Sequence, residues 1–199
     1  MATYLLFCTA DIAPEVLDTL LSTPKHDSFS LVRNPEQSAF DLQPTKTPVA
    51  PFNTGFANWT SEQIRKFVTK HLPDTPNGSN LVPGVYALLD ARGGRDGTIV
   101  IGHSYSPLLE RDVDTMTEEE REEWEEAVES HDYDNDEDLE WWEWRVTFDD
   151  SWHLTTLLDF ESDSTRLLYD RDFVASHTDA NGVFQMTRAW KEFTRGEGD

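Results

Sequence analysis

The stretch VYALLDARGGRDGTIVIGH, residues 85–103, contains two apolar runs separated by a segment rich in glycine and charge. Residues 85–91 and 97–103 each have the length and the apolar character of a buried strand. The ARGGRDG segment that joins them supplies glycines and an Asp-Gly pair, which are typical of a turn. Residues 85–103 therefore predict a β-hairpin.

The N-terminal region predicts a β-α-β unit. Residues 4–9 and 29–32 are short apolar runs of the kind that form buried strands. Between them, apolar residues recur at the spacing of one helix face: Leu17, Leu20 and Leu21. Two strands joined through a helix are typical of parallel pairing in one sheet.

A proline-rich segment follows this unit. Pro35, Pro44, Pro48 and Pro51 predict a long extended loop over residues 34–57, because the residue before a proline avoids the helical region. A capping box, Thr60-x-x-Gln63, then predicts a helix. Its inner face would consist of three apolar residues: Ile64, Phe67 and Val68.

The tryptophan-rich region predicts a second hairpin. Residues 142–148 and 152–160 read WEWRVTF and WHLTTLLDF, with Asp149-Asp150-Ser151 as the loop. Alternation then places five residues on one buried face: Trp142, Trp144, Val146, Trp152 and Leu154. A closing amphipathic helix is predicted from a further apolar set at helical spacing: Met186, Ala189, Trp190 and Phe193.

Together these elements predict an α+β fold in a single domain over residues 1–199. We expect a mixed and largely antiparallel sheet with helices packed on one face. The proline-rich loop at 34–57 and an acidic helix-loop at 110–140 are the two departures from this core. The acidic helix-loop is expected to project from the body.

Composition excludes several classes of function. The chain carries 39 acidic and 16 basic residues, a net charge of −23, which disfavours direct binding to nucleic acid or to an anionic membrane. No apolar run reaches the roughly 18 residues of a membrane span, and the start lacks the basic residues of a signal peptide. We therefore expect a cytoplasmic or nuclear protein. Neither a dinucleotide nor a phosphate-loop motif occurs, so no cofactor is predicted.

The negative charge is concentrated in one part of the chain. Residues 110–143 contain eighteen acidic and two basic residues. The remainder of the chain therefore has a net charge of only −7. Thr117-x-x-Glu120 is a second capping box and predicts the start of a helix. Its narrow apolar stripe would dock the helix on the body and leave the acids in water: Trp124, Ala127 and Val128.

This acidic face predicts a surface that binds a basic protein partner. Carboxylates supply long-range attraction, and neighbouring aromatic rings supply anchors. The expected partner-binding residues are Glu122, Glu123, Tyr133, Asp134, Asp136, Asp138 and Trp141. Alternatively, this acidic segment binds no partner and only increases the solubility of the protein.

The stretch HDYDNDEDLEWWE, residues 131–143, resembles the calcium loop of the EF-hand family. Five acidic residues stand at the first, third, fifth, seventh and twelfth positions of that loop: Asp132, Asp134, Asp136, Asp138 and Glu143. Glu137 occupies the position at which the family has a glycine. The resemblance implies calcium binding as an alternative function.

The stretch TIVIGHSYSP, residues 98–107, resembles the nucleophile elbow of the α/β-hydrolases, with Ser106 in place of the second glycine. The chain order of that family is nucleophile, acid and histidine. Ser104, then Asp170 or Asp172, then His177 would satisfy the order. The resemblance implies a small serine hydrolase as the first alternative to partner binding, ahead of calcium binding, whereas the hairpins around Ser104 favour a protein without catalysis.

Overall fold

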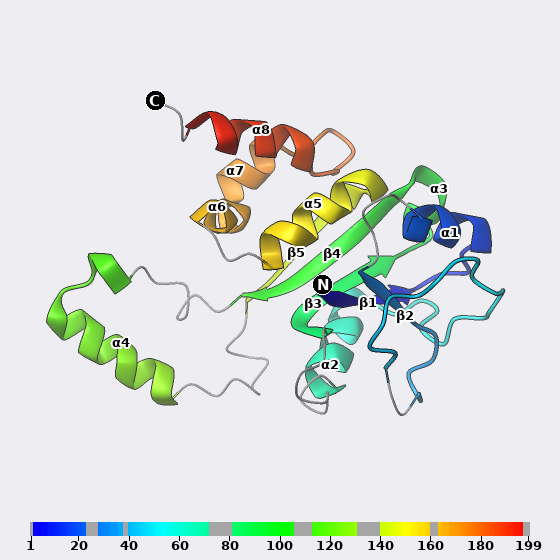
Figure 1. The fold of residues 1–199 in the computed structure, drawn as a ribbon, viewed down its shortest axis with the longest axis horizontal. Coiled ribbons are helices and arrows are strands. Elements are labelled where there is room, and N and C mark those ends of the chain that lie inside the picture. Colours follow the sequence, from blue (N-terminus) through cyan, green and yellow to red (C-terminus); the bar gives the residue numbers. More distant parts are fainter. Residues whose placement is uncertain are drawn as a thin grey trace.

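The computed structural model describes residues 2–22, 28–37, 40–71, 81–105, 113–130, 140–159 and 163–196. Within these ranges the chain forms a mixed five-stranded sheet in the order β2-β1-β3-β4-β5, with helices against it (Figure 1). The strands are β1 (Thr3–Cys8), β2 (Phe29–Val32), β3 (Leu81–Leu89), β4 (Thr98–Tyr105) and β5 (Glu140–Thr147). The predicted α+β class with a mixed sheet is confirmed.

The helices are α1 (Pro14–Ser22), α2 (Ser61–His71), α3 (Gly93–Asp96), α4 (Glu118–Ser130), α5 (Phe148–Asp159), α6 (Asp163–Arg166), α7 (Arg171–Ser176) and α8 (Met186–Gly196). The described ranges also contain two short 3-10 turns, η1 (Val113–Thr115) and η3 (Leu167–Tyr169). Both predicted capping boxes are confirmed, since Thr60 and Thr117 exchange hydrogen bonds with Gln63 and Glu120.

The first three strands are parallel. β1 pairs with β2 on one side and with β3 on the other, and both pairings are parallel. This confirms the predicted β-α-β unit. The β3–β4 and β4–β5 pairings are antiparallel, which confirms the hairpin of residues 85–103. Two of these strand pairings are therefore parallel and two are antiparallel, whereas the sequence predicted a largely antiparallel sheet.

Helices cover both faces of the sheet, whereas the sequence predicted one. Helices α1, α5 and α8 pack with alternate strand residues such as Leu6, Ile101 and Trp144. On the opposite face, α2 packs its three predicted apolar residues against Leu5 and other residues of the strands. The chain runs from β1 to β2 through α1, and then from β2 to β3, on the other side of β1, through α2. These two parallel connections run in opposite directions along the sheet, so right-handed crossovers place α1 and α2 on opposite faces.

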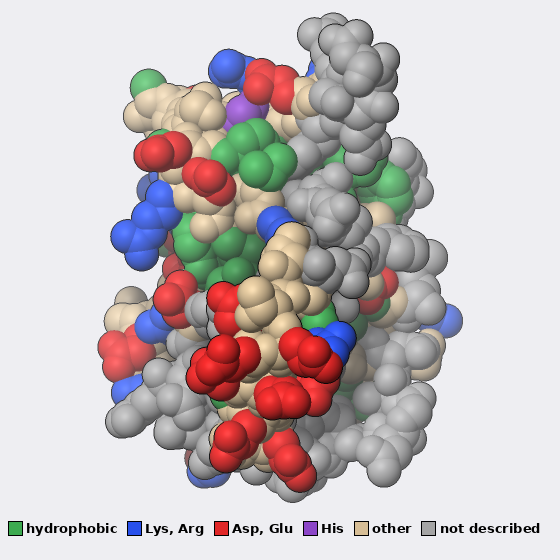
Figure 2. All heavy atoms as spheres, turned by 90° about the vertical axis from the view of Figure 1, so that its left-hand side faces the viewer, with side chains coloured by type: hydrophobic (Ala, Val, Ile, Leu, Met, Phe, Trp, Pro, Cys, Tyr) green, Lys and Arg blue, Asp and Glu red, His purple; other side chains and the backbone are tan. Residues whose placement is uncertain are grey.

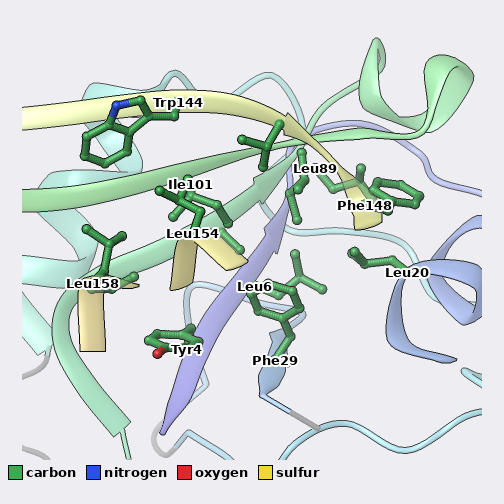
Figure 3. Packing of buried hydrophobic residues seen from close by; sticks show 14 of the residues in the cluster. Tyr4, Leu6, Leu20, Phe29, Leu89, Ile101, Trp144, Phe148, Leu154 and Leu158 are labelled. Atoms are coloured by element: carbon green, nitrogen blue, oxygen red, sulfur yellow. The ribbon is translucent and has the colours of Figure 1, made fainter. Parts of the chain in front are cut away.

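Trp144 is the largest fully buried side chain of the core and is 2% exposed. Figure 3 shows it on the same face of the sheet as Ile101, with Leu154 and Leu158 of α5 packed against that face. The burial predicted for Trp144, Val146 and Leu154 is thus confirmed, whereas Trp142 and Trp152 are half-buried.

The second predicted hairpin is wrong. Residues 148–159 form α5, and only residues 140–147 form a strand. Thr147 Oγ1 accepts a hydrogen bond from the Asp150 amide, and two acidic residues occupy the first turn, where the helix dipole favours them. The residues expected to form a loop therefore begin a helix.

Residues 40–60 contain no helix or strand, in agreement with the predicted extended loop. The loop covers the outer edge of β2, because the Thr45 amide donates to the Phe29 carbonyl and Thr45 Oγ1 accepts from the Leu31 amide. In the closing helix α8, Met186 and Ala189 are buried as predicted, but Trp190 is 39% exposed. The Phe193 side chain lies outside the described part of the structure.

Candidate functional site

The acidic stretch is inserted between two neighbouring strands. Tyr105 at the end of β4 pairs with Glu140 at the start of β5, and residues 106–139 connect them. Helix α4 lies within this insertion, and Figure 1 shows it projecting from the end of the sheet at which β4 ends and β5 begins. The predicted projection of the acidic helix is therefore present.

Helix α4 exposes nearly all of its charge. Its sequence EEEREEWEEAVES contains eight glutamates and one arginine, and each of these nine side chains is exposed. Figure 2 shows this concentration of carboxylates on the side from which the helix projects. None of the α4 residues is fully buried, and the stripe expected to dock on the body is half-buried: Trp124, Ala127 and Val128.

The charges of α4 repel one another. Residues four apart on a helix are neighbours, and like charges at this spacing cost about 0.2–0.5 kcal/mol per pair. The helix has four such glutamate pairs: 118 with 122, 119 with 123, 122 with 126 and 125 with 129. Its last turn also lacks a basic residue to match the helix dipole. These four pairs therefore cost α4 roughly 1–2 kcal/mol. The three glutamates of its first turn, which the helix dipole favours, offset part of this cost.

Strand β5 carries the aromatic part of the predicted surface. The Trp141 ring is half-buried against Tyr86, with ring centroids 5.7 Å apart, and the guanidinium of Arg65 lies 5.9 Å from its centroid. Next to it, Glu143 is exposed and accepts a 2.7 Å hydrogen bond from the Tyr86 hydroxyl. Burial, and then the nearby Glu143 carboxylate, raise the pKa of Tyr86 above its ordinary value.

Three of the predicted partner-binding residues are described. Glu122 and Glu123 lie on α4, and Trp141 lies on β5. The other four lie outside the described residues: Tyr133, Asp134, Asp136 and Asp138. That all seven form one face stays a prediction.

The calcium loop also falls largely outside the described residues, because Asp132, Asp134, Asp136 and Asp138 are among those without a description. Its twelfth position, Glu143, is in β5, and one of its carboxylate oxygens accepts the Tyr86 hydroxyl. Within the described ranges, no group of three or more His, Cys, Asp or Glu side chains is placed to hold a metal ion.

The residues of the hydrolase alternative have separate local roles. Ser104 lies within β4, which continues through Tyr105, so the chain does not turn at the serine. Asp170 is the N-cap of α7 and accepts from the Asp172 and Phe173 amides, while Asp172 lies in the first turn. His177 is buried, with Nδ1 2.9 Å from the Phe173 carbonyl oxygen. The Asp170 carboxylate bonds the Asp172 and Phe173 amides, and His177 Nδ1 lies beside Ser176 and Phe173, so none of these hydrogen bonds joins Ser104 or His177 to an aspartate.

Two features were not anticipated from the sequence. His103 on β4 contacts Tyr169, with 2.7 Å between Nδ1 and the hydroxyl oxygen, and burial lowers the pKa of His103 to about 4.

At the opposite end of β4, a polar groove of about 730 Å³ is lined by Arg92, Arg95, Asp96, Thr98, Thr147, Asp179, Asn181, Val183 and Gln185. The groove brings together residues 92–98, Thr147 and residues 179–185, which are distant from one another in the chain, so no local pattern could have revealed it.

The groove does not indicate a ligand by its charge. Arg92 forms a 2.9 Å ion pair with Asp96 and donates to the Asn181 carbonyl at 2.8 Å. Two acidic side chains accompany the two arginines, so the lining has no net charge.

Comparison of the chain with protein-family models, with curated proteins and with solved structures finds no significant match. Among the described residues, none of the helices has the length and apolar character needed to cross a membrane. Support for a function therefore comes from the described side chains and their surroundings.

Proposed function

We propose that the protein is an interaction protein that binds a basic protein partner through its acidic insertion, without catalysis. The observation that carries this proposal is the exposed, self-repelling helix α4 at the end of the sheet. A helix that has no fully buried residue and places four pairs of like charges together gains less from the fold than a helix with a buried face.

A basic partner would change this balance. Lysine and arginine side chains placed between the glutamates would replace repulsion by attraction, so α4 would be more stable in the complex than in the free protein. Concentrated charge also accelerates association by steering the approach of the partner, and salt weakens this steering. Arg121 is the only basic residue of α4, so within the helix a single positive charge opposes the eight glutamates.

The proposal is tested by comparing two variants with the same change in net charge. In the first, Glu122, Glu123, Glu125 and Glu126 of α4 become glutamine. In the second, four exposed acidic residues elsewhere are neutralised: Asp11, Glu15, Glu36 and Asp149. The immobilised wild type and both variants are incubated with cell lysate at low salt, and proteins released as the salt concentration rises are identified by mass spectrometry.

We expect the wild type and the second variant to retain the same basic polypeptides and to release them at the same salt concentration. The α4 variant should release them at lower salt. Equal losses in both variants would contradict a located binding surface, because net charge alone would then account for retention. Retention that does not change with salt or with either variant would contradict the acidic interaction altogether.

A further inference from the structure

The backbone of β5 has one paired and one open side. The Phe148 amide donates to the Gly97 carbonyl at 3.0 Å, whereas the Arg145 carbonyl accepts from the Phe184 amide, which lies outside the sheet, at 2.7 Å. Because successive residues of a strand direct their backbone groups to opposite sides, even-numbered residues of β5 face β4. Glu143 and Arg145 therefore direct their amides and carbonyls away from the sheet.

These outward groups are largely unused. β5 is the last strand in the sheet order, and the hydrogen bond from Phe184 takes only the carbonyl of Arg145. The amide and carbonyl of Glu143 and the amide of Arg145 have no hydrogen-bond partner in the described part of the chain. Glu143 is also exposed, so an incoming chain can reach these groups.

The two edges of the sheet differ in this respect. At the β2 edge, the loop of residues 40–45 supplies partners for the Phe29 carbonyl, the Leu31 amide and the Ser30 hydroxyl, and all four residues of β2 are buried. Natural proteins commonly cover a sheet edge in this way, because open backbone groups attract a further strand. β5 is eight residues long, and among the described residues Phe184 bonds its outward side at Arg145, near its end, whereas the Glu143 backbone groups have no partner there.

We infer that the open edge of β5 accepts an extended, basic segment of the partner as an added strand. This inference rests on the proposed function and names the conformation that the partner adopts. Strand addition provides affinity through backbone hydrogen bonds and specificity through alternate side chains. The hydrogen bond from Phe184 to Arg145 limits the added strand to the part of β5 before Arg145.

The side chains around the edge define the sequence of such a segment. Glu143 points to one face of the sheet and Trp142 to the other, and Trp142 is half-buried. A strand that alternates basic and apolar residues would place a lysine or arginine beside the Glu143 carboxylate and an apolar side chain beside Trp142. Helix α4, connected to the start of β5 through residues 131–139, would add attraction for the basic face.

The same charges disfavour a second copy of this chain as the occupant. Two β5 edges brought together would place glutamates of both copies in one sheet, and like charges on adjacent strands are destabilising. Each copy also carries a net charge of −23. Inward or edge-located charge is a common means by which proteins prevent pairing between their own edges.

The inference is tested with a fluorescent eight-residue peptide of alternating lysine and valine. The control peptide is methylated at every backbone nitrogen, so it keeps its charge but cannot donate backbone hydrogen bonds. Binding to the full-length chain is measured by fluorescence anisotropy at low and physiological salt. Amide hydrogen exchange of Glu143 is measured by NMR with and without each peptide.

We expect the unmodified peptide to bind about tenfold more tightly than the methylated one, since several backbone hydrogen bonds are lost on methylation. It should also slow exchange of the Glu143 amide. In Glu143→Pro this difference between the peptides should disappear, whereas Glu143→Gln, which removes the same charge, should retain it. The proline is compatible with folding, because the Glu143 amide points away from β4.

Equal binding of the two peptides, or unchanged exchange at Glu143, would overturn strand addition while leaving the proposed acidic interaction intact. The four-glutamine α4 variant separates the two ideas, because it should weaken both peptides equally and leave their ratio unchanged. Sedimentation of the chain alone gives one further outcome. A dimer that the unmodified peptide dissociates would show that a second copy is the occupant and would refute the basic segment.

Discussion

The Tyr86 hydroxyl on β3 donates a 2.7 Å hydrogen bond to the Glu143 carboxylate on β5, across the intervening strand β4. Gly102 of β4 pairs with both residues and makes this contact possible. A Cβ atom at Gly102 would lie 2.2 Å from Cζ of the Tyr86 ring, so any larger residue would occupy the space that the ring fills. The tyrosine is fully buried, and its hydroxyl links the interior to the exposed edge strand.

Gly102→Ala should lower the free energy of unfolding by about 2–4 kcal/mol, because the added methyl group overpacks the site and displaces the hydroxyl from Glu143. Tyr86→Phe should cost only about 1–2 kcal/mol, since it removes the hydrogen bond and keeps the ring. Urea denaturation of the single and double variants provides the check. If Gly102→Ala costs as much in a Tyr86→Ala background as in the wild type, the ring is not the cause.

Trp144→Ala should lower the free energy of unfolding by about 3–5 kcal/mol, because the residue is 2% exposed and its removal leaves a cavity in the core. Trp190→Ala is the matched control. That tryptophan is 39% exposed, so we expect a loss below about 1.5 kcal/mol. Chemical denaturation measures both variants, and a similar loss in the two would contradict the burial of Trp144.

His103 should make folding sensitive to mild acid. Burial lowers its pKa to about 4, below the ordinary value of 6.5, so the unfolded chain binds the proton more readily than the folded chain. The contribution to stability is therefore complete above pH 6.5 and decreases as the pH falls towards 4. Because the residue retains some accessible surface, we expect a loss of about 2 kcal/mol, less than the roughly 3 kcal/mol of the full shift.

The His103 prediction is checked by measuring unfolding free energies of the wild type and His103→Asn between pH 7 and 4. The variant should lack this part of the pH dependence, whereas acidic residues continue to contribute in both proteins. NMR titration of the His103 ring supplies a direct readout. A midpoint near 6.5 would contradict the effect of burial.

Replacing Glu122, Glu123, Glu125 and Glu126 by glutamine should leave global unfolding unchanged within about 0.5 kcal/mol, since α4 buries none of its residues. Helix content should rise slightly at low salt, because the substitutions remove all four like-charge pairs at i,i+4 spacing. Circular dichroism at low and high salt measures this change. A cooperative loss of stability in the variant would show that the glutamates support the fold.

Ser104 should not react as a nucleophile. Its hydroxyl lies against Gly84, where an added Cβ atom would come within 2.1 Å of Oγ, and Ser104 lies within β4, which extends to Tyr105. A fluorophosphonate probe should therefore leave Ser104 unlabelled, as judged by mass spectrometry of the intact chain. Stoichiometric labelling that His177→Ala abolishes would support the hydrolase alternative instead.

The sequence by itself determined the elements whose signals lie within a few residues. The capping boxes at Thr60 and Thr117 formed as predicted, because each depends on contacts between residues three apart. The apolar faces of α1 and α2 and the hairpin of residues 85–103 were also readable, since helical spacing and glycine-rich turns are local patterns. The acidic character and helical form of residues 118–130 belong to the same group.

Only the tertiary structure decided what residues 148–159 become. Leu154 and Leu158 satisfy both a strand alternation and the spacing of a helix, so the local pattern is ambiguous. In the fold, β4 already occupies the paired side of β5, and α8 packs against the next segment. Thr187 of α8 donates to the Asp150 carboxylate, which fixes the start of α5. Long-range packing thus selects the helix.

The role of Gly102 and the open edge of β5 likewise depend on strand order. In the sequence, Gly102 is part of a motif that resembles a nucleophile elbow, yet in the sheet it makes room for Tyr86. Whether β5 has a free side depends on which strands pair with it and on where Phe184 ends its coverage. These properties arise from contacts between residues distant in the chain, and a local pattern of side chains contains no information about which distant segments meet.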